Sequence, residues 1–457
     1  MAGFPYENEF EVHRTLPEHG TDKDVVLSVL AAMSKVENPT WETGQCSGTM
    51  YCGDHDHYDF LNEAFSYFSY VNSLQRDMCP SNTKFEAEII AMTLDLLSGS
   101  ALADPAGLIT SGGSGSIAHA VLAYREHRAT PRRPNMIKPE TAHPAFSKAG
   151  HLFGVEMKVA PVDPVTTQVD LDWVRDHIDE NTLALVGSAC NYGYGTIDPI
   201  VELGALALER GIGLHVDGCL GGWILPFGRE LGYDIAPFDF SVPGVTTISA
   251  DTHKYGYALK GTSVLCFADR ALRNDQYFYL TDWSGGKYCS PGMDGSRSGG
   301  LLAATWAAMV HLGRAGYRRY AEAIFATSAQ MQEAVKEHAS LRIMGQPTFL
   351  FSFTSDEYDI YLVNDFLRLR GWRLNGQQYP NALHMAVTRP QTQPGVAERW
   401  RDDLAEAVAY AHEHRDEAPK SGAIYGGVAG GMTEDADAFI KFFMAEMMDK
   451  QAAVPAP

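Results

Sequence analysis

Three features that often reveal a protein's class are missing from this sequence of 457 residues. It has no run of eighteen or more apolar residues, no cysteines spaced as CxxC, and no apolar stretch behind a basic N-terminus. The first absence argues against a membrane-spanning helix. The seven dispersed cysteines indicate neither a disulfide framework nor a zinc site. Since the start, MAGFPYENEFEVHR, predicts no signal peptide or anchor, we expect a soluble cytoplasmic protein.

Basic side chains are also scarce. The chain has 36 lysines and arginines against 57 aspartates and glutamates, for a formal charge of −21. This balance argues against nucleic acid or an anionic membrane surface as a general partner. An anionic substrate would therefore need a local basic pocket.

The one dense group of metal-ligand residue types is Asp54, His55, Asp56 and His57. The four are consecutive, and a helix cannot direct four neighbouring side chains at one ion. A helix start capped by an aspartate is the better interpretation. We expect no metal site.

The pattern of apolar residues predicts an α/β fold. A hydrophobic content of 45% is typical of a globular protein, and the length suggests one large domain with smaller additions. Strand-like and helix-like segments alternate from residue 107 to residue 218, which favours a mainly parallel sheet covered by helices on both faces. We expect an N-terminal arm over residues 1–60, a large domain over 61–318 and a small C-terminal α/β domain over 319–457.

The segment SADTHKYG, residues 249–256, places Lys254 where an apolar strand gives way to a loop. Most lysines are solvated surface groups. Here the polar residues Asp251, Thr252 and His253 come directly before the lysine, and Asp217 ends another predicted strand. A lysine that forms a Schiff base with an aldehyde cofactor needs an acid to keep the cofactor's pyridine nitrogen protonated. Lys254 and Asp217 suit these two roles.

The segment TSGGSGS, residues 110–116, lies between a predicted strand and a predicted helix. Such a turn exposes backbone N–H groups at the positive end of the helix dipole, which suits a phosphate. A glycine turn without a ligand is the alternative.

Four segments in this order resemble the pyridoxal-phosphate-dependent sphingosine-1-phosphate lyases: TSGGSGS, HVDGCLGG, SADTHKYGYALKG and TDWSGGKYCSPGMDGSRSGG. The resemblance extends from about Ser47 to about Gly427. It implies the fold-type-I architecture of the group II decarboxylase superfamily, with pyridoxal 5′-phosphate (PLP) as cofactor. Lyases of animals and fungi carry a membrane anchor, so this chain resembles a bacterial form without one.

The resemblance also implies which residues bind the cofactor. The family holds the cofactor phosphate at the glycine-rich turn, although it usually has glutamate and serine where this chain has Gly115 and Ser116. A serine in the long loop of residues 284–300 crosses to the neighbouring subunit, which predicts a homodimer. The implied cofactor-binding residues are Gly113, Ser114, Gly115, His143, which stacks on the ring, Asp217, His253, Lys254 and Ser296.

On the substrate side, the resemblance places Tyr192 beside the reacting centre, and Tyr51 and Lys260 around the polar head of the substrate. Tyr192 and Lys260 are also the candidates for proton transfer. The lyases commonly carry an LHPD-like segment whose histidine binds the substrate phosphate, but this chain reads SLQRDMCP, with Gln75 and Arg76 at that place. We expect Arg76 to restore some of the lost charge.

These residues predict retro-aldol cleavage of the Cα–Cβ bond in a phosphorylated long-chain base, giving a fatty aldehyde and phosphoethanolamine. The alternatives are an amino-acid decarboxylase, another retro-aldol lyase, or a non-catalytic relative.

Overall fold

The computed structural model describes residues 5–13, 15–128, 133–422, 441 and 444–445. The chain begins with four helices, α1 (Lys23–Glu37), α2 (Pro39–Glu42), α3 (His55–Ser66) and α4 (Pro80–Leu96). The Asp54 side chain caps α3 by accepting a hydrogen bond from the His57 N–H. The interpretation of this acidic and histidine-rich run as a capped helix start is therefore confirmed.

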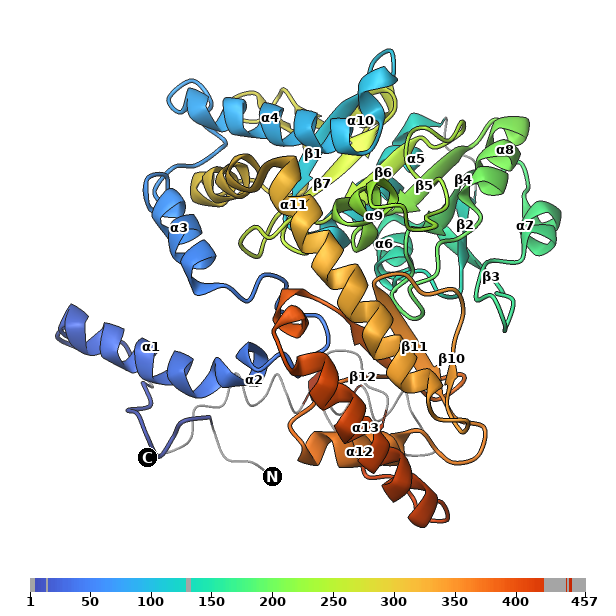
Figure 1. The fold of residues 1–457 in the computed structure, drawn as a ribbon. Helices are drawn as coiled ribbons and strands as arrows, with labels where there is room; N and C mark the ends of the chain where they lie inside the picture. Colours follow the sequence, from blue (N-terminus) through green and yellow to red (C-terminus); the bar gives the residue numbers. More distant parts are fainter. Residues whose placement is uncertain (1–4, 14, 129–132, 423–440, 442–443, 446–457) are drawn as a thin grey trace.

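A seven-stranded sheet forms the centre of the larger part of the molecule (Figure 1). Its order is β1 (Ala106–Thr110), β7 (Ser263–Phe267), β6 (Thr247–Ala250), β5 (Gly213–Asp217), β4 (Thr182–Ser188), β2 (Asn135–Pro139) and β3 (Glu156–Ala160). All neighbouring pairs are parallel except those made by β7, which runs antiparallel to β1 and β6. The predicted mainly parallel sheet is confirmed.

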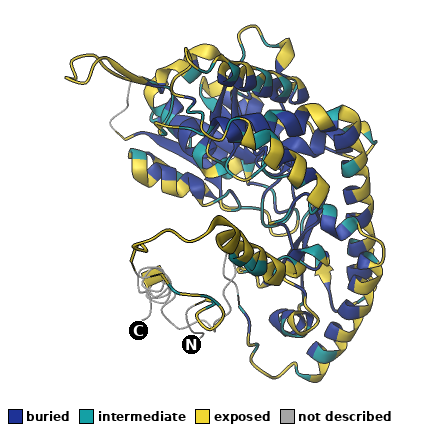
Figure 2. Ribbon diagram, turned by 90° about the vertical axis from the view of Figure 1, so that its left-hand side faces the viewer, coloured by how far each residue is buried: buried dark blue, intermediate teal, exposed yellow. Residues whose placement is uncertain are grey.

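Helices cover this sheet on both faces: α5 (Gly113–His127), α6 (Ala145–Phe153), α7 (Leu171–His177), α8 (Ile200–Arg210), α9 (Leu225–Glu230) and α10 (Arg270–Asp275). Every residue of β1, β4 and β7 is buried, as expected for strands covered on both sides. Figure 2 shows the buried residues concentrated in the sheet and on the inward sides of the helices. None of the described helices is long and apolar enough to cross a membrane.

The helix α11 (Gly299–Lys336) connects this part to a four-stranded antiparallel sheet (Figure 1). That sheet has the order β10 (Arg342–Ile343), β11 (Leu350–Thr354), β13 (Ala382–Ala386) and β12 (Asn375–Gln377), and α12 (Tyr361–Leu369) and α13 (Val396–Glu413) pack nearby. Gly313, with φ of 54°, interrupts the helical geometry of α11. The predicted boundary at residue 318 falls five residues later in the same helix, and residues 423–440 and 446–457 of the predicted C-terminal domain lie outside the described residues.

Two segments differ from the simple picture of an arm and a loop. Within the predicted arm, Ser47 and Gly48 donate backbone hydrogen bonds to Arg373 and Ala386, so this segment joins the small sheet. Within the predicted glycine-rich loop, β9 (Tyr288–Ser290) pairs with β8 (Phe278–Leu280) as a short hairpin. The first pairing has no pattern in the local sequence, because its partners lie more than 300 residues away, whereas the hairpin is local and its strands are only three residues long.

Candidate active site

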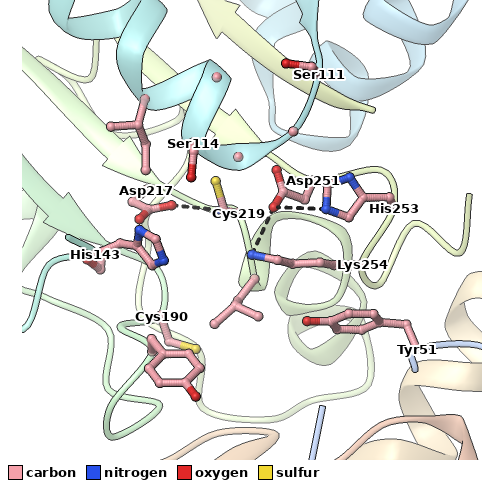
Figure 3. Close-up of a pocket in the computed structure, with 17 residues that line it drawn as sticks. Tyr51, Ser111, Ser114, His143, Cys190, Asp217, Cys219, Asp251, His253 and Lys254 are labelled. Atoms are coloured by element: carbon pink, nitrogen blue, oxygen red, sulfur yellow. Dashed lines mark hydrogen bonds and ion pairs between the residues drawn. The ribbon is translucent and has the colours of Figure 1, made fainter. Parts of the chain in front are cut away.

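The carboxyl ends of several central strands meet at one edge of the large sheet, where functional groups gather in α/β proteins. Asp217 ends β5, Asp251 follows β6, and the turn into α5 follows β1. They surround a cavity of about 460 Å³ (Figure 3). The residues that line it are Tyr51, Ser111, Gly112, Gly113, Ser114, Gly115, Ile117, His143, Ser188, Cys190, Tyr192, Asp217, Cys219, Leu220, Asp251, His253 and Lys254.

Lys254 points into this cavity and forms an ion pair with Asp251. Its Nζ lies 2.9 Å from Asp251 Oδ2, and the Asp251 side chain is only 1% exposed. Burial alone would lower the pKa of Lys254, but the charge of Asp251 outweighs it and raises this pKa well above the usual value. Burial would likewise raise the pKa of Asp251, but the charges of Lys254 and His253 lower it. The pair therefore fixes the position of the Lys254 amine.

Asp217 lies across the cavity from Lys254, beside His143 (Figure 3). Its Oδ1 accepts hydrogen bonds from the Cys219 N–H at 3.1 Å and the Ser249 hydroxyl at 3.3 Å. His143 Nδ1 accepts from the Ala145 N–H at 3.1 Å. Burial lowers the pKa of His143, although the Asp217 charge opposes this effect. The structure therefore provides a carboxylate and a neutral imidazole on the same side of the cavity.

The N-terminus of α5 forms a third wall. Gly112 precedes it with φ of 145°, and no side chain caps the helix there. A Cβ atom added to Gly113 would lie 2.6 Å from Asp251 Oδ2 and 2.9 Å from Cys219 Sγ, so only glycine fits at this position. Uncapped backbone N–H groups at a helix N-terminus suit a phosphate.

These features fit PLP. The uncapped turn suits the cofactor phosphate, and Lys254 suits the cofactor aldehyde. Asp217 and His143 suit the pyridine ring. Three buried polar atoms of cavity-lining residues, Ser188 Oγ, Asp251 Oδ1 and His253 Nδ1, have no hydrogen-bond partner among the described residues. Buried polar atoms without a hydrogen-bond partner are uncommon in protein interiors, and their presence here agrees with a site that binds a polar group.

Tyr51 lines the cavity on the Lys254 side (Figure 3), and Lys260 contacts Tyr51 without lining the cavity itself. The Lys260 Nζ lies 4.5 Å from the centre of the Tyr51 ring and donates a hydrogen bond to the Thr49 carbonyl at 3.0 Å. Lys260 as a whole is exposed, yet desolvation of its ammonium group and the nearby Lys254 charge lower its pKa to about 8. Lys260 is therefore a cation at neutral pH that loses its charge as the pH rises through about 8.

Tyr192 also lines the cavity, and the smaller sheet holds it in place. Its ring stacks on His384 of β13, with centroids 4.6 Å apart. The carbonyl of the next residue, Gly193, accepts hydrogen bonds from Ser352 and Gln377. The sequence did not predict these contacts or the ion pair between Asp251 and Lys254. The run of polar residues before Lys254 was a signal for that ion pair.

Four predicted site residues do not line the cavity within one chain: Gln75, Arg76, Lys260 and Ser296. Arg76 Nη2 lies 2.5 Å from Glu86 Oε2, and Arg297 Nη1 lies 2.5 Å from Glu86 Oε1. The Ser296 hydroxyl accepts a hydrogen bond from the Asn72 amide at 2.9 Å. The Arg76 guanidinium is thus already paired with a carboxylate.

The sequence matches the family model described as "Pyridoxal-dependent decarboxylase conserved domain" over residues 17–351. The chain is 40% identical to a sphingosine-1-phosphate lyase of Dictyostelium discoideum, an alignment that covers 91% of this chain and 78% of that protein. It is 35% identical to a probable sphingosine-1-phosphate lyase of Legionella pneumophila, with 84% and 66% covered.

Solved structures agree with these matches. The structure superposes on that of a sphingosine-1-phosphate lyase of Burkholderia pseudomallei with a TM-score of 0.92 and 54% identity, covering 99% of this chain and all of that one. A glutamate decarboxylase of Lactobacillus brevis gives a TM-score of 0.75 at 18% identity, over 91% of this chain and 97% of that one, and shows the shared fold alone. With the site geometry and these relatives taken together, the chain belongs to the sphingosine-1-phosphate lyase family of PLP-dependent enzymes.

Proposed function

We propose that this PLP-dependent lyase cleaves the Cα–Cβ bond of sphingosine 1-phosphate or a similar phosphorylated long-chain base, and releases a fatty aldehyde and phosphoethanolamine. The observation that carries the proposal is a single cavity containing Lys254, Asp217 and the uncapped N-terminus of α5 in a chain similar to these lyases over 91% of its length. An amino-acid decarboxylase, the alternative raised by the sequence, is supported by the shared fold and by the broad family model, whereas the more similar relatives named above are sphingosine-1-phosphate lyases.

Different side chains bind the cofactor and transfer the proton in this proposal. When bound, PLP supplies an electron sink for the bond that breaks at Cα. Lys254 would bind the aldehyde of the cofactor, Asp217 would contact its ring nitrogen, and His143 would stack on its ring. The phosphate end would be bound by Gly113, Ser114, Gly115 and His253. Cleavage also requires a base that removes the proton from the substrate hydroxyl. Tyr192 is the proposed group for this proton, and its stacking on His384 fixes its ring.

The substrate headgroup is assigned to Lys260 and Tyr51. A protonated Lys260 suits a phosphate, whereas a neutral one does not. Because the pKa of Lys260 is about 8, its charge is present below that pH and is lost as the pH rises through it. We therefore expect the preference for a phosphorylated substrate to weaken above about pH 8.

Replacing Lys260 by methionine should raise the Michaelis constant for sphingosine 1-phosphate by about 10- to 100-fold, the usual effect of losing a charged hydrogen bond. The constant for an unphosphorylated analogue should change far less. The measurement compares kcat/KM for both substrates at pH 7 and pH 9.5, with Lys260→Arg as the control that keeps the charge. Equal use of both substrates by the wild-type protein would refute the headgroup assignment.

We also propose a homodimer with sites shared between subunits, located in the cytoplasm. Ser296, Gln75 and Arg76 do not line the active-site cavity of their own chain, so we assign their implied contacts with the cofactor phosphate and the substrate to a second copy. Two-fold symmetry is the commonest arrangement for such sharing. The seven cysteines, all without a disulfide, agree with a reducing compartment.

The dimer has a direct test. Light scattering at assay concentrations should give twice the mass of one chain, and Ser296→Ala should weaken PLP binding without changing that mass. A fully active monomer would exclude shared sites.

A further inference from the structure

A row of buried polar side chains leads through the sheet to Asp217. His215 and Asp217 lie on β5, and Thr247 and Ser249 lie opposite them on β6, in the register His215 with Thr247 and Asp217 with Ser249. Because side chains alternate along a strand, the four share one face of the sheet. His215, Thr247 and Ser249 are completely buried, and Asp217 is 7% exposed. Buried polar groups of this kind are expected to be fully paired.

Hydrogen-bonding distances connect the row from end to end. Thr247 Oγ1 lies 2.7 Å from His215 Nδ1, and His215 Nε2 lies 3.3 Å from Ser249 Oγ. Ser249 Oγ lies 3.3 Å from Asp217 Oδ1. At the far end, the Tyr124 hydroxyl lies 2.7 Å from Thr247 Oγ1.

The carboxylate sets the direction of these hydrogen bonds. An ionised Asp217 only accepts, so Ser249 donates its proton to Oδ1 and its own oxygen accepts from His215 Nε2–H. His215 Nδ1 then has no proton and accepts from Thr247, and the Tyr124 hydroxyl lies 2.7 Å from the hydroxyl oxygens of both Thr246 and Thr247. Burial lowers the pKa of His215 to about 4, so the ring is neutral, as this chain of donors requires.

We propose that Ser249, His215 and Thr247 are positioning residues that hold the Asp217 carboxylate in the correct orientation toward the pyridine nitrogen of PLP. Ser249 and the Cys219 N–H both donate to Oδ1, which leaves Oδ2 as the oxygen for the ring nitrogen. A buried carboxylate is stabilised in its charged form by donors such as these. The inference rests on the proposed role of Asp217 and extends it to three residues that do not line the cavity.

The test uses the holoenzyme bound to PLP labelled with nitrogen-15 in the ring. In Ser249→Ala, the ring-nitrogen resonance should move toward that of an unprotonated pyridine, and kcat should fall about tenfold with less than about a twofold change in KM. Thr247→Val, which keeps the shape but removes the donor to His215, should produce a smaller shift of the same sign. The double variant should have the same ring-nitrogen resonance and the same kcat as Ser249→Ala alone, because both substitutions break the same chain of hydrogen bonds.

A matched control is Thr93→Val. Thr93 is a completely buried threonine whose hydroxyl donates to the Ile89 carbonyl of its own helix, so its loss should change stability but leave the resonance unchanged. An unmoved resonance in both Ser249→Ala and Thr247→Val, while Asp217→Asn moves it, would overturn the positioning role alone. An unmoved resonance in Asp217→Asn as well would overturn the role of Asp217 itself.

Discussion

Replacing Lys254 by alanine is expected to abolish covalent attachment of PLP and to reduce turnover by on the order of 10⁴-fold or more. Lys254 is the one lysine among the described residues that line the cavity, and its ion pair with Asp251 aims its amine at that space. The Asp251 carboxylate would be left buried without its partner, so the melting temperature of the variant should be measured alongside its activity.

The measurement is borohydride reduction of the loaded protein followed by peptide mapping of the modified lysine. Lys148→Ala, at an exposed position of α6, is the control and should retain both attachment and turnover. Recovery of the reduced cofactor on another lysine in the Lys254→Ala protein would show that Lys254 is not the attachment site.

Asp217→Asn should retain PLP on Lys254 but reduce kcat by about 100- to 1000-fold, as expected when one preorganised electrostatic contact is removed. An asparagine oxygen can still accept from the Cys219 N–H and the Ser249 hydroxyl, so the local fold should survive. The neutral amide cannot hold the ring nitrogen protonated, and that loss affects the chemical step rather than binding.

Steady-state kinetics and the cofactor absorption spectrum together check this expectation. Asp170→Asn is a suitable control, because Asp170 caps α7 at an exposed position and asparagine caps equally well. Turnover of Asp217→Asn within a few-fold of wild type would contradict the assigned role.

Much of the fold and the centre of the site could be predicted from the sequence, because the relevant signals are local. The strand before Lys254, the uncapped glycine turn before α5 and the Asp54 cap of α3 each depend on residues adjacent in the chain. Asp217 and His143 lie near each other as expected, because Asp217 ends one parallel strand and His143 follows the carboxyl end of another.

The parts that could not be predicted depend on partners distant in the chain. The stacking of Tyr192 on His384 joins residues that are 192 positions apart, and no local sequence pattern predicts it. The expectation that Arg76 restores charge for the substrate came from its place beside Gln75. It took no account of Glu86, which binds both Arg76 and Arg297 in the folded chain. The contribution of Arg76 to substrate binding remains a prediction, now tied to a second copy of the chain.

The central claim is that this protein cleaves a phosphorylated long-chain base between Cα and Cβ. The most direct test is to incubate the purified, PLP-loaded protein with sphingosine 1-phosphate, and in parallel with amino acids, and to quantify phosphoethanolamine, long-chain aldehyde and carbon dioxide. We expect phosphoethanolamine and aldehyde in equal amounts, with neither formed by Lys254→Ala. Release of carbon dioxide from amino acids with no cleavage of sphingosine 1-phosphate would contradict the account.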